Sequence, residues 1–177
     1  MQAERLLILF RHGHSSQPQG VADHDRPLAS DGKEDVAWAA AKFANQGLLP
    51  EVILCSTAKR TRETASIFCE TSQCTADIIF LNHLYLADAQ SILGTISTMP
   101  EETLRIMVIG HNPGINCLAH DLAPRLLCDH TMTPSALASF KINAPNWEFV
   151  DSHSAELQEF IAPELKEADL QPRVDPV

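Results

Sequence analysis

The fold of this chain is decided by the stretch Leu6-Leu7-Ile8-Leu9-Phe10-Arg11-His12-Gly13. Its apolar run is too short for a helix and is ended at once by charge and glycine, which is typical of a strand buried on both faces of a parallel sheet. A cation, an imidazole and a glycine then stand at the carboxyl end of that strand. Open α/β sheets bind their ligands at such ends, so the sequence predicts a central strand that leads into a binding site.

Short apolar runs alternate with helical patterns over residues 6–122. The patterns predict strands at 6–10, 51–55, 78–81 and 105–109, and helices at about 30–46, 56–70, 89–98 and 115–122. Strands that alternate with helices favour an α/β fold. We therefore expect a doubly wound, mostly parallel central sheet with helices on both faces.

The last third of the chain has a different character. Residues 136–142 and 147–150 are predicted to be two strands around a turn at 143–146, forming a hairpin at one edge of the sheet. The sequence after residue 165 is rich in proline and charge, as loosely ordered chain ends often are. We expect a single domain over residues 1–165 and a loosely ordered tail over residues 166–177.

Composition excludes several classes of function. The chain has 177 residues and a formal net charge of −10, and an acidic surface repels a nucleic-acid backbone. No apolar run approaches the roughly 20 residues needed to span a bilayer. The first residues lack the features of a secretory signal, and the five cysteines include no C-x-x-C pair. These observations predict a cytoplasmic protein with reduced thiols that binds neither nucleic acid nor membrane.

Three predicted strand ends carry chemically useful side chains. The first has Arg11 and His12, the second leads into a helix that begins around Arg60, and the fourth is followed by His111. The carboxyl ends of parallel strands lie on one edge of a sheet, so these side chains are expected to converge. Guanidinium groups bind phosphate oxygens bidentately, and a histidine can attack phosphorus as a nucleophile. The cluster predicts phosphoryl chemistry that needs no metal.

The motifs around these residues resemble those of the histidine phosphatase superfamily, which has the phosphoglycerate mutase-like fold. The resemblance rests on Arg11-His12-Gly13-x-Ser15, on Ser56-x-x-x-Arg60-Thr61-x-x-Thr64-Ala65 and on Gly110-His111-Asn112-Pro113. The small size and the motif Arg26-Pro27-Leu28-x-x-x-Gly32 are similar to the SixA-type phosphohistidine phosphatases. The resemblance implies a small member of the superfamily without a large cap over the site.

The resemblance also implies roles for individual residues. His12 becomes the phospho-acceptor, and Arg11, Arg60 and His111 become the phosphate pocket. Ser15 matches a position that often adds a hydroxyl contact. A carboxylate between the second and third motifs protonates the leaving group in many relatives, and Asp88 is the nearest candidate here. Capping the helix that follows is an equally good role for Asp88.

The sequence thus predicts a cofactor-independent phosphohydrolase with a covalent phosphohistidine intermediate. Its favoured substrate is phosphohistidine on a protein. A phosphatase for a small phosphometabolite or nucleotide, or a non-catalytic phosphate-binding regulatory module, remains as an alternative. His12-x-His14 also resembles a metal-ligand pair, but the spacing lacks a second ligand cluster, so no metal is predicted.

Overall fold

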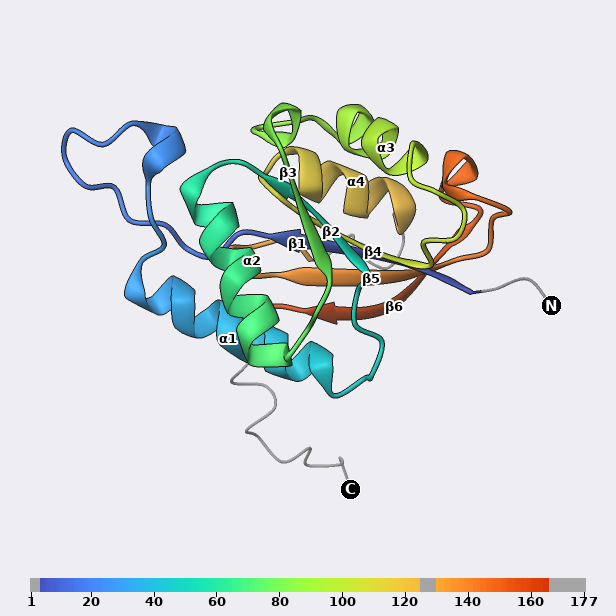
Figure 1. Cartoon of the computed structure of the whole chain (residues 1–177), viewed down its shortest axis with the longest axis horizontal. Helices are drawn as coiled ribbons and strands as arrows, with labels where there is room; N and C mark the ends of the chain where they lie inside the picture. Colours follow the sequence, from blue (N-terminus) through green and yellow to red (C-terminus); the bar gives the residue numbers. More distant parts are fainter. Residues whose placement is uncertain (1–3, 125–129, 166–177) are drawn as a thin grey trace, which may run out of the picture.

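The fold is built on one six-stranded sheet (Figure 1), seen in a computed structural model that describes residues 4–124 and 130–165. The strands lie in the order β3-β2-β4-β1-β5-β6. The first four in this order pair in parallel, and β5 then pairs antiparallel with both β1 and β6. The prediction of a mostly parallel α/β sheet is confirmed. The bounds are β1 (Arg5–Arg11), β2 (Val52–Ser56), β3 (Asp77–Leu81), β4 (Arg105–Gly110), β5 (Leu137–Ile142) and β6 (Ala155–Ile161).

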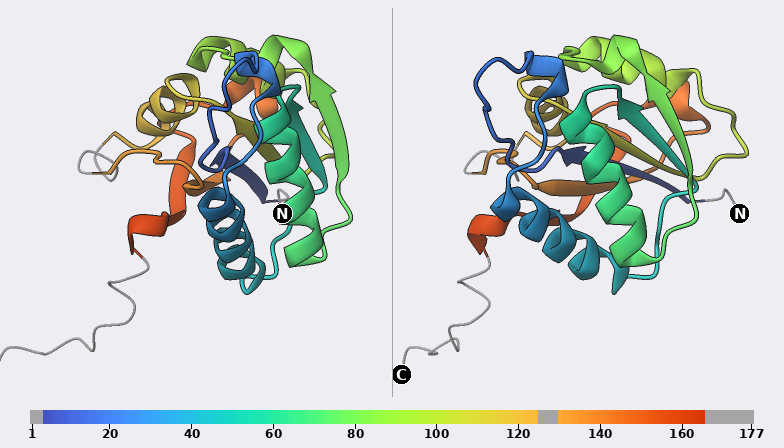
Figure 2. Two further views of the ribbon diagram at one scale, coloured as in Figure 1. Left: turned by 90° about the vertical axis from the view of Figure 1, so that its left-hand side faces the viewer. Right: turned by 60° about the vertical axis from the view of Figure 1, so that its left-hand side comes forward.

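Helices cover both faces of this sheet (Figures 1 and 2). Buried residues of α1 (Ser30–Ala44) and α2 (Lys59–Ser72) pack on one face, and those of α3 (Ala89–Ser97) and α4 (Gly114–Leu122) pack on the other. Four short 3₁₀ turns complete the description: η1 (Asp23–Asp25), η2 (Asn82–Leu84), η3 (Trp147–Phe149) and η4 (Pro163–Leu165).

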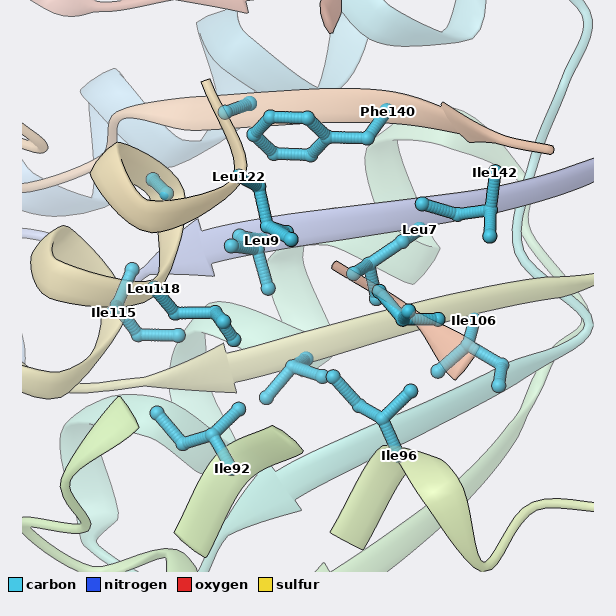
Figure 3. Packing of buried hydrophobic residues seen from close by; sticks show 14 of the residues in the cluster. Leu7, Leu9, Ile92, Ile96, Ile106, Ile115, Leu118, Leu122, Phe140 and Ile142 are labelled. Atoms are coloured by element: carbon cyan, nitrogen blue, oxygen red, sulfur yellow. The ribbon is translucent and has the colours of Figure 1, made fainter. Parts of the chain in front are cut away.

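Strand β1 joins the two halves of the core because its side chains point to alternate faces. Leu7 and Leu9 belong to the cluster beneath α3 and α4, which Figure 3 shows from close by. Ile8 and Phe10 belong to the opposite cluster, beneath α1 and α2. All four side chains are completely buried. This confirms the prediction of a strand that is buried on both faces.

The predicted hairpin is only partly correct. Its first strand is β5, but residues 147–150 do not form the second one, because η3 occupies 147–149 and the partner strand is β6. Asn146 caps η3 by accepting a hydrogen bond from the Glu148 amide, and the Trp147 indole donates to the Thr103 carbonyl. Trp147 is fully buried, so its packing overrides the strand propensity of this aromatic segment. The antiparallel pair still lies at the sheet edge, and the predicted tail at 166–177 lies outside the described residues.

The expectations about membrane-spanning segments and cysteines can be compared with the structure. Among residues 4–124 and 130–165, no helix is long and apolar enough to cross a membrane. Cys55, Cys69, Cys74 and Cys117 carry free thiols, whereas Cys128 lies outside those ranges.

Gly32 allows the start of α1 to press against the loop that leaves β1. A Cβ atom at Gly32 would lie 2.1 Å from the carbonyl oxygen of His14, whereas a Cβ at Gly94 in α3 would meet nothing within 4 Å. We expect Gly32→Ala to lower the free energy of unfolding by about 2 kcal/mol, as overpacking against backbone does. Gly94→Ala serves as the control and should raise stability by about 0.5–1 kcal/mol. Urea denaturation measures both, and equal effects of the two substitutions would contradict this account of Gly32.

Candidate active site

The hydrogen-bond register of the sheet brings the predicted residues to one edge. Arg11 pairs with Gly110 across β1 and β4, and the His12 amide donates to the Gly110 carbonyl at 3.2 Å. His111 therefore follows directly beside His12, while α2 presents Arg60 after the end of the neighbouring β2. A cavity of about 680 Å³ opens here and is lined by all four predicted side chains, Arg11, His12, Arg60 and His111.

Two hydrogen bonds define the protonation of His12. Its Nδ1 lies 2.7 Å from the Gly13 carbonyl oxygen, which can only accept, so Nδ1 carries the proton. The Arg60 Nε–H points at the His12 Nε2 at 3.3 Å, so Nε2 offers its lone pair. Burial, together with the charges of Arg60, Arg11 and Arg26, lowers the pKa of His12 to about 4. His12 is thus a neutral imidazole at neutral pH, with Nε2 free to attack an electrophile.

Arg60 is held rigidly although it is almost completely buried. Its Nη1 donates to the Asp23 carbonyl at 2.6 Å, and its Nη2 donates to the Asp23 carboxylate at 3.0 Å. The guanidinium also lies 5.9 Å from the centre of the Tyr85 ring. These contacts fix the plane of the guanidinium and keep its Nε directed at His12.

His111 forms the inner wall of the site. Its Nε2 lies 2.8 Å from the Ser56 hydroxyl at the end of β2, and its ring centre lies 5.0 Å from that of His12. Burial, and then the positive charges around His12 and Arg60, lower the pKa of His111 to about 3. Both histidines are therefore uncharged at neutral pH, and the arginines supply the positive charge of the site.

Arg11 stands at the other side of the cavity, at the end of β1. Its Nη1 donates to the Met132 carbonyl at 2.9 Å, and the amide of Asn112 donates to the same oxygen at 2.9 Å. Burial lowers the pKa of Arg11 from its ordinary value, but an arginine remains charged at any physiological pH. The shared carbonyl orients Arg11 and Asn112 together along the cavity wall.

Sequence reasoning missed the carboxylate of Asp23. It accepts hydrogen bonds from Arg60, from Arg26 at 2.8 Å and from the Tyr85 hydroxyl at 2.6 Å. The bonds from Tyr85, Arg26 and Arg60 hold the pKa of Asp23 well below its usual range, so this carboxylate stays ionised. The i,i+3 spacing of Asp23 and Arg26 was the only local signal of this pair, because Arg60 and Tyr85 come from distant segments. Figure 2 shows that the loop carrying η1 stands beside the start of α2.

The two remaining predicted residues are placed differently from each other. Ser15 lines the cavity, and its hydroxyl accepts a hydrogen bond from Arg26 at 2.9 Å. Asp88 is exposed and caps α3 by accepting from the Ser91 amide at 2.8 Å, and that bond lowers the pKa of the carboxyl. Asp88 does not line the cavity. The structure thus brings Ser15 to the cluster and shows Asp88 in its alternative role, as a helix cap.

The residue types in this cavity favour an oxyanion. Within the described ranges, histidine, cysteine, aspartate and glutamate side chains form no group of three or more that could hold a metal ion. The buried Arg60, the half-buried Arg11 and a hydrogen-bonded serine instead lie around a neutral imidazole. Arginine and serine donors are suited to the oxygens of a tetrahedral anion, and a neutral imidazole has a lone pair available for reaction. The fold and these residue types are those of an enzyme that acts on phosphorylated substrates.

Comparison with known proteins agrees with that class. Residues 7–84 match the family model of the histidine phosphatase superfamily (branch 1). An uncharacterised protein of Mycobacterium leprae is 30% identical over 167 residues, which span 87% of this chain and 99% of that protein. The chain belongs to the histidine phosphatase superfamily and is a phosphatase, and its structural neighbours are of the SixA type.

Solved structures show the same fold. A protein from Nakamurella multipartitia described as the phosphohistidine phosphatase SixA is 26% identical, with a TM-score of 0.77 over 91% of this chain and 97% of the other. The protein histidine phosphatase SixA complexed with tungstate is 20% identical, with a TM-score of 0.73 over 94% of this chain and 99% of the other. The predicted phosphoglycerate mutase-like fold is confirmed.

The low pKa of His12 predicts a pH dependence of stability. The folded-state pKa of about 4 lies below the ordinary value of 6.5, so between these values the unfolded chain binds a proton that the folded chain does not. Stability should therefore fall as the pH is lowered from 7 toward 4, by about 1.4 kcal/mol per pH unit for each such proton. Urea denaturation at several pH values should give a shallower slope for His12→Gln than for the wild type. The exposed His153 provides the control, because His153→Gln should keep the wild-type slope.

Proposed function

We propose that this phosphatase hydrolyses its substrate through a covalent phosphohistidine at His12, and that its substrate is phosphohistidine on a protein. The observation that carries the proposal is the orientation of His12, which lines the cavity and whose Nε2 carries a lone pair that accepts a hydrogen bond from Arg60. A residue that only bound phosphate would act as a donor, whereas the Nε2 of His12 can only accept. This orientation favours a nucleophile over a simple phosphate-binding residue.

In the first step, His12 Nε2 attacks the phosphorus atom and the bond to the leaving group breaks. Arg60 and Arg11 neutralise the charge on the phosphoryl oxygens, and the Ser15 hydroxyl adds a polar contact. Arg60 is well placed for this role because its Nε already points at the attacking nitrogen. As Nε2 attacks, the Arg60 Nε–H passes from this nitrogen to a phosphoryl oxygen, while Asp23 holds the other end of the guanidinium in place.

In the second step, water attacks the phosphorus atom and releases phosphate from His12. The product histidine is neutral because its pKa is low, so it is a better leaving group from phosphorus than an ordinary histidine. His111 is held against Ser56 and lines the cavity beside His12, a position from which it would contact the phosphoryl oxygens. The cycle returns His12 to its starting state without a metal.

The shape of the cavity supports a substrate carried on a protein. The floor is formed by buried residues, whereas the rim includes the exposed side chains of His14, Gln17 and Leu86. Leu86 has a φ of 52° and is 54% exposed, so the chain holds an apolar side chain at the mouth in an unfavourable backbone conformation. An open mouth with a mixed apolar and polar rim admits a side chain that projects from a larger surface. The similarity to SixA phosphohistidine phosphatases supports the same substrate class.

Replacement of the nucleophile tests the mechanism. We expect His12→Ala to lower kcat/KM for 4-nitrophenyl phosphate by at least about 1000-fold, because the covalent route is lost. Rapid quenching with ³²P-labelled substrate should trap acid-labile phosphate on the wild type but not on the variant. EDTA should leave the wild-type rate unchanged, and His153→Ala is the matched control for loss of a histidine. Bound phosphate without a covalent adduct would instead identify a phosphate-binding module, and inhibition by EDTA would contradict the metal-free mechanism.

A comparison of substrates tests the second half of the proposal. We expect kcat/KM for a phosphorylated histidine-phosphotransfer domain to exceed that for phosphorylated metabolites and nucleotides by at least about tenfold, since a P–N bond needs less acid assistance than a P–O bond. A metabolite or nucleotide that matched the phosphoprotein would favour the small-molecule phosphatase. The polar extension of the cavity around Ser15 and Arg26 is the feature that would bind such a molecule.

A further inference from the structure

We propose that His14, oriented by Asp31, is the residue that donates a proton to the leaving group and later accepts one from the attacking water. The inference rests on the proposed function, because it adds the missing acid and base to the reaction at His12. The inference assigns a catalytic role to His14, which is not one of the residues of the predicted phosphate pocket.

The geometry of His14 is that of an oriented proton-transfer residue. Its Nδ1 lies 2.7 Å from the Asp31 Oδ2 in the first turn of α1. The carboxylate accepts, so Nδ1 carries a hydrogen and Nε2 is the nitrogen available to a substrate. The bond from His14 lowers the pKa of Asp31, which keeps the carboxylate ionised beside the ring. A carboxylate in this position fixes the tautomer and stabilises an imidazolium.

The backbone around His14 is fixed as firmly as its ring. The Ala29 amide donates to the His14 carbonyl at 2.9 Å, and Gly32 packs directly against the same carbonyl. Ser15 then forms a bridge with Leu28. The segment that carries His14 and the turn that carries Asp31 are thus tied together, which keeps the dyad in one arrangement.

The side chain of His14 also lies on the side of the chain that faces the active-site cavity. A Cβ at Gly13 would meet Val36 and Leu28, so this position faces α1. His12 and His14, on either side of Gly13, both line the active-site cavity. His12 is largely buried, whereas the His14 side chain is 57% exposed. The phosphoryl group would therefore lie at the floor, and the leaving group would pass His14 at the mouth.

Other titratable groups near the cavity are already engaged. Asp23 remains ionised under hydrogen bonds from three side chains, and Asp88 caps α3. His111 is buried, and its Nε2 is bonded to Ser56. His14 is the histidine at the mouth of the cavity, and an imidazole can both donate and accept a proton. It is therefore the group best placed to transfer a proton at that point.

The proposed proton transfers balance over the cycle. As His12 Nε2 forms its bond to phosphorus, the bond from phosphorus to the leaving atom breaks, and the leaving atom takes the proton from Nε2 of the His14 imidazolium. His14 is then neutral, and its Nε2 accepts a proton from the water that attacks phosphorus. The bond between His12 and phosphorus breaks, phosphate leaves, and His14 is an imidazolium again. Asp31 keeps its charge throughout.

Leaving-group dependence tests this role, because a merely structural residue would affect all substrates equally. With phenyl phosphate, whose leaving group needs a proton, His14→Gln should lower kcat/KM by about 100-fold or more. With 2,4-dinitrophenyl phosphate, whose leaving group departs as a stable anion, the loss should be no more than about threefold. Asp31→Asn should show the same pattern with smaller losses, and His153→Gln should match the wild type with both substrates.

Rapid quenching separates this inference from the proposed function. With 2,4-dinitrophenyl phosphate, His14→Gln should accumulate phospho-His12, because water attack then lacks its base. Equal losses on both substrates, or wild-type rates for His14→Gln, would overturn the role of His14 while leaving phospho-His12 in place. Absence of phospho-His12 in the wild type would overturn both proposals. Unchanged tungstate affinity and urea midpoint would show that His14→Gln retains the pocket and the fold.

Discussion

The parallel pairing of β1 with β4 is the constraint on which the active site depends. The register that sets Arg11 opposite Gly110 also sets His12 beside His111, at the end of two strands that are buried on both faces. A shift of this register by one residue would turn the side chains of β1 to the opposite faces of the sheet and would break both halves of the core. The hydrophobic core and the catalytic cluster are thus specified by the same set of backbone hydrogen bonds.

Local charge in the site opposes the charge of the whole chain. The protein carries a formal net charge of −10, yet the cavity gathers Arg11, Arg26 and Arg60 around two neutral histidines. The Asp23 carboxylate partly neutralises this cluster and holds Arg60 in place. Because the histidines are uncharged, the positive charge belongs to the arginines, and His12, the proposed nucleophile, keeps its lone pair. The net negative charge also disfavours non-specific binding of polyanions.

The hydrophobic pattern of the sequence was sufficient to predict those strands and helices whose structure depends on their own residues. The continuous apolar run of β1 and the alternation of strands and helices predicted the sheet because periodicity and length are local properties. The same approach failed at residues 147–150, where the indole of Trp147 bonds the Thr103 carbonyl and buries itself in the core. That contact joins segments far apart in the sequence, so no local propensity contains it. Asp23 was missed for a similar reason, since two of its three donors, Arg60 and Tyr85, lie on distant elements.

By itself the sequence determined which chemistry this protein carries, since the identities of Arg11, His12, Arg60 and His111 and their places at strand ends already indicate a histidine phosphatase. The tertiary structure decided the protonation and the supporting contacts of those groups. Which nitrogen of His12 is free depends on the Gly13 carbonyl and on Arg60, and the direction of Arg60 depends on Asp23. It also showed that Asp88 caps a helix while His14 lines the cavity. The physical reason is that hydrogen bonding and desolvation act through space, between groups that only the folded chain brings together.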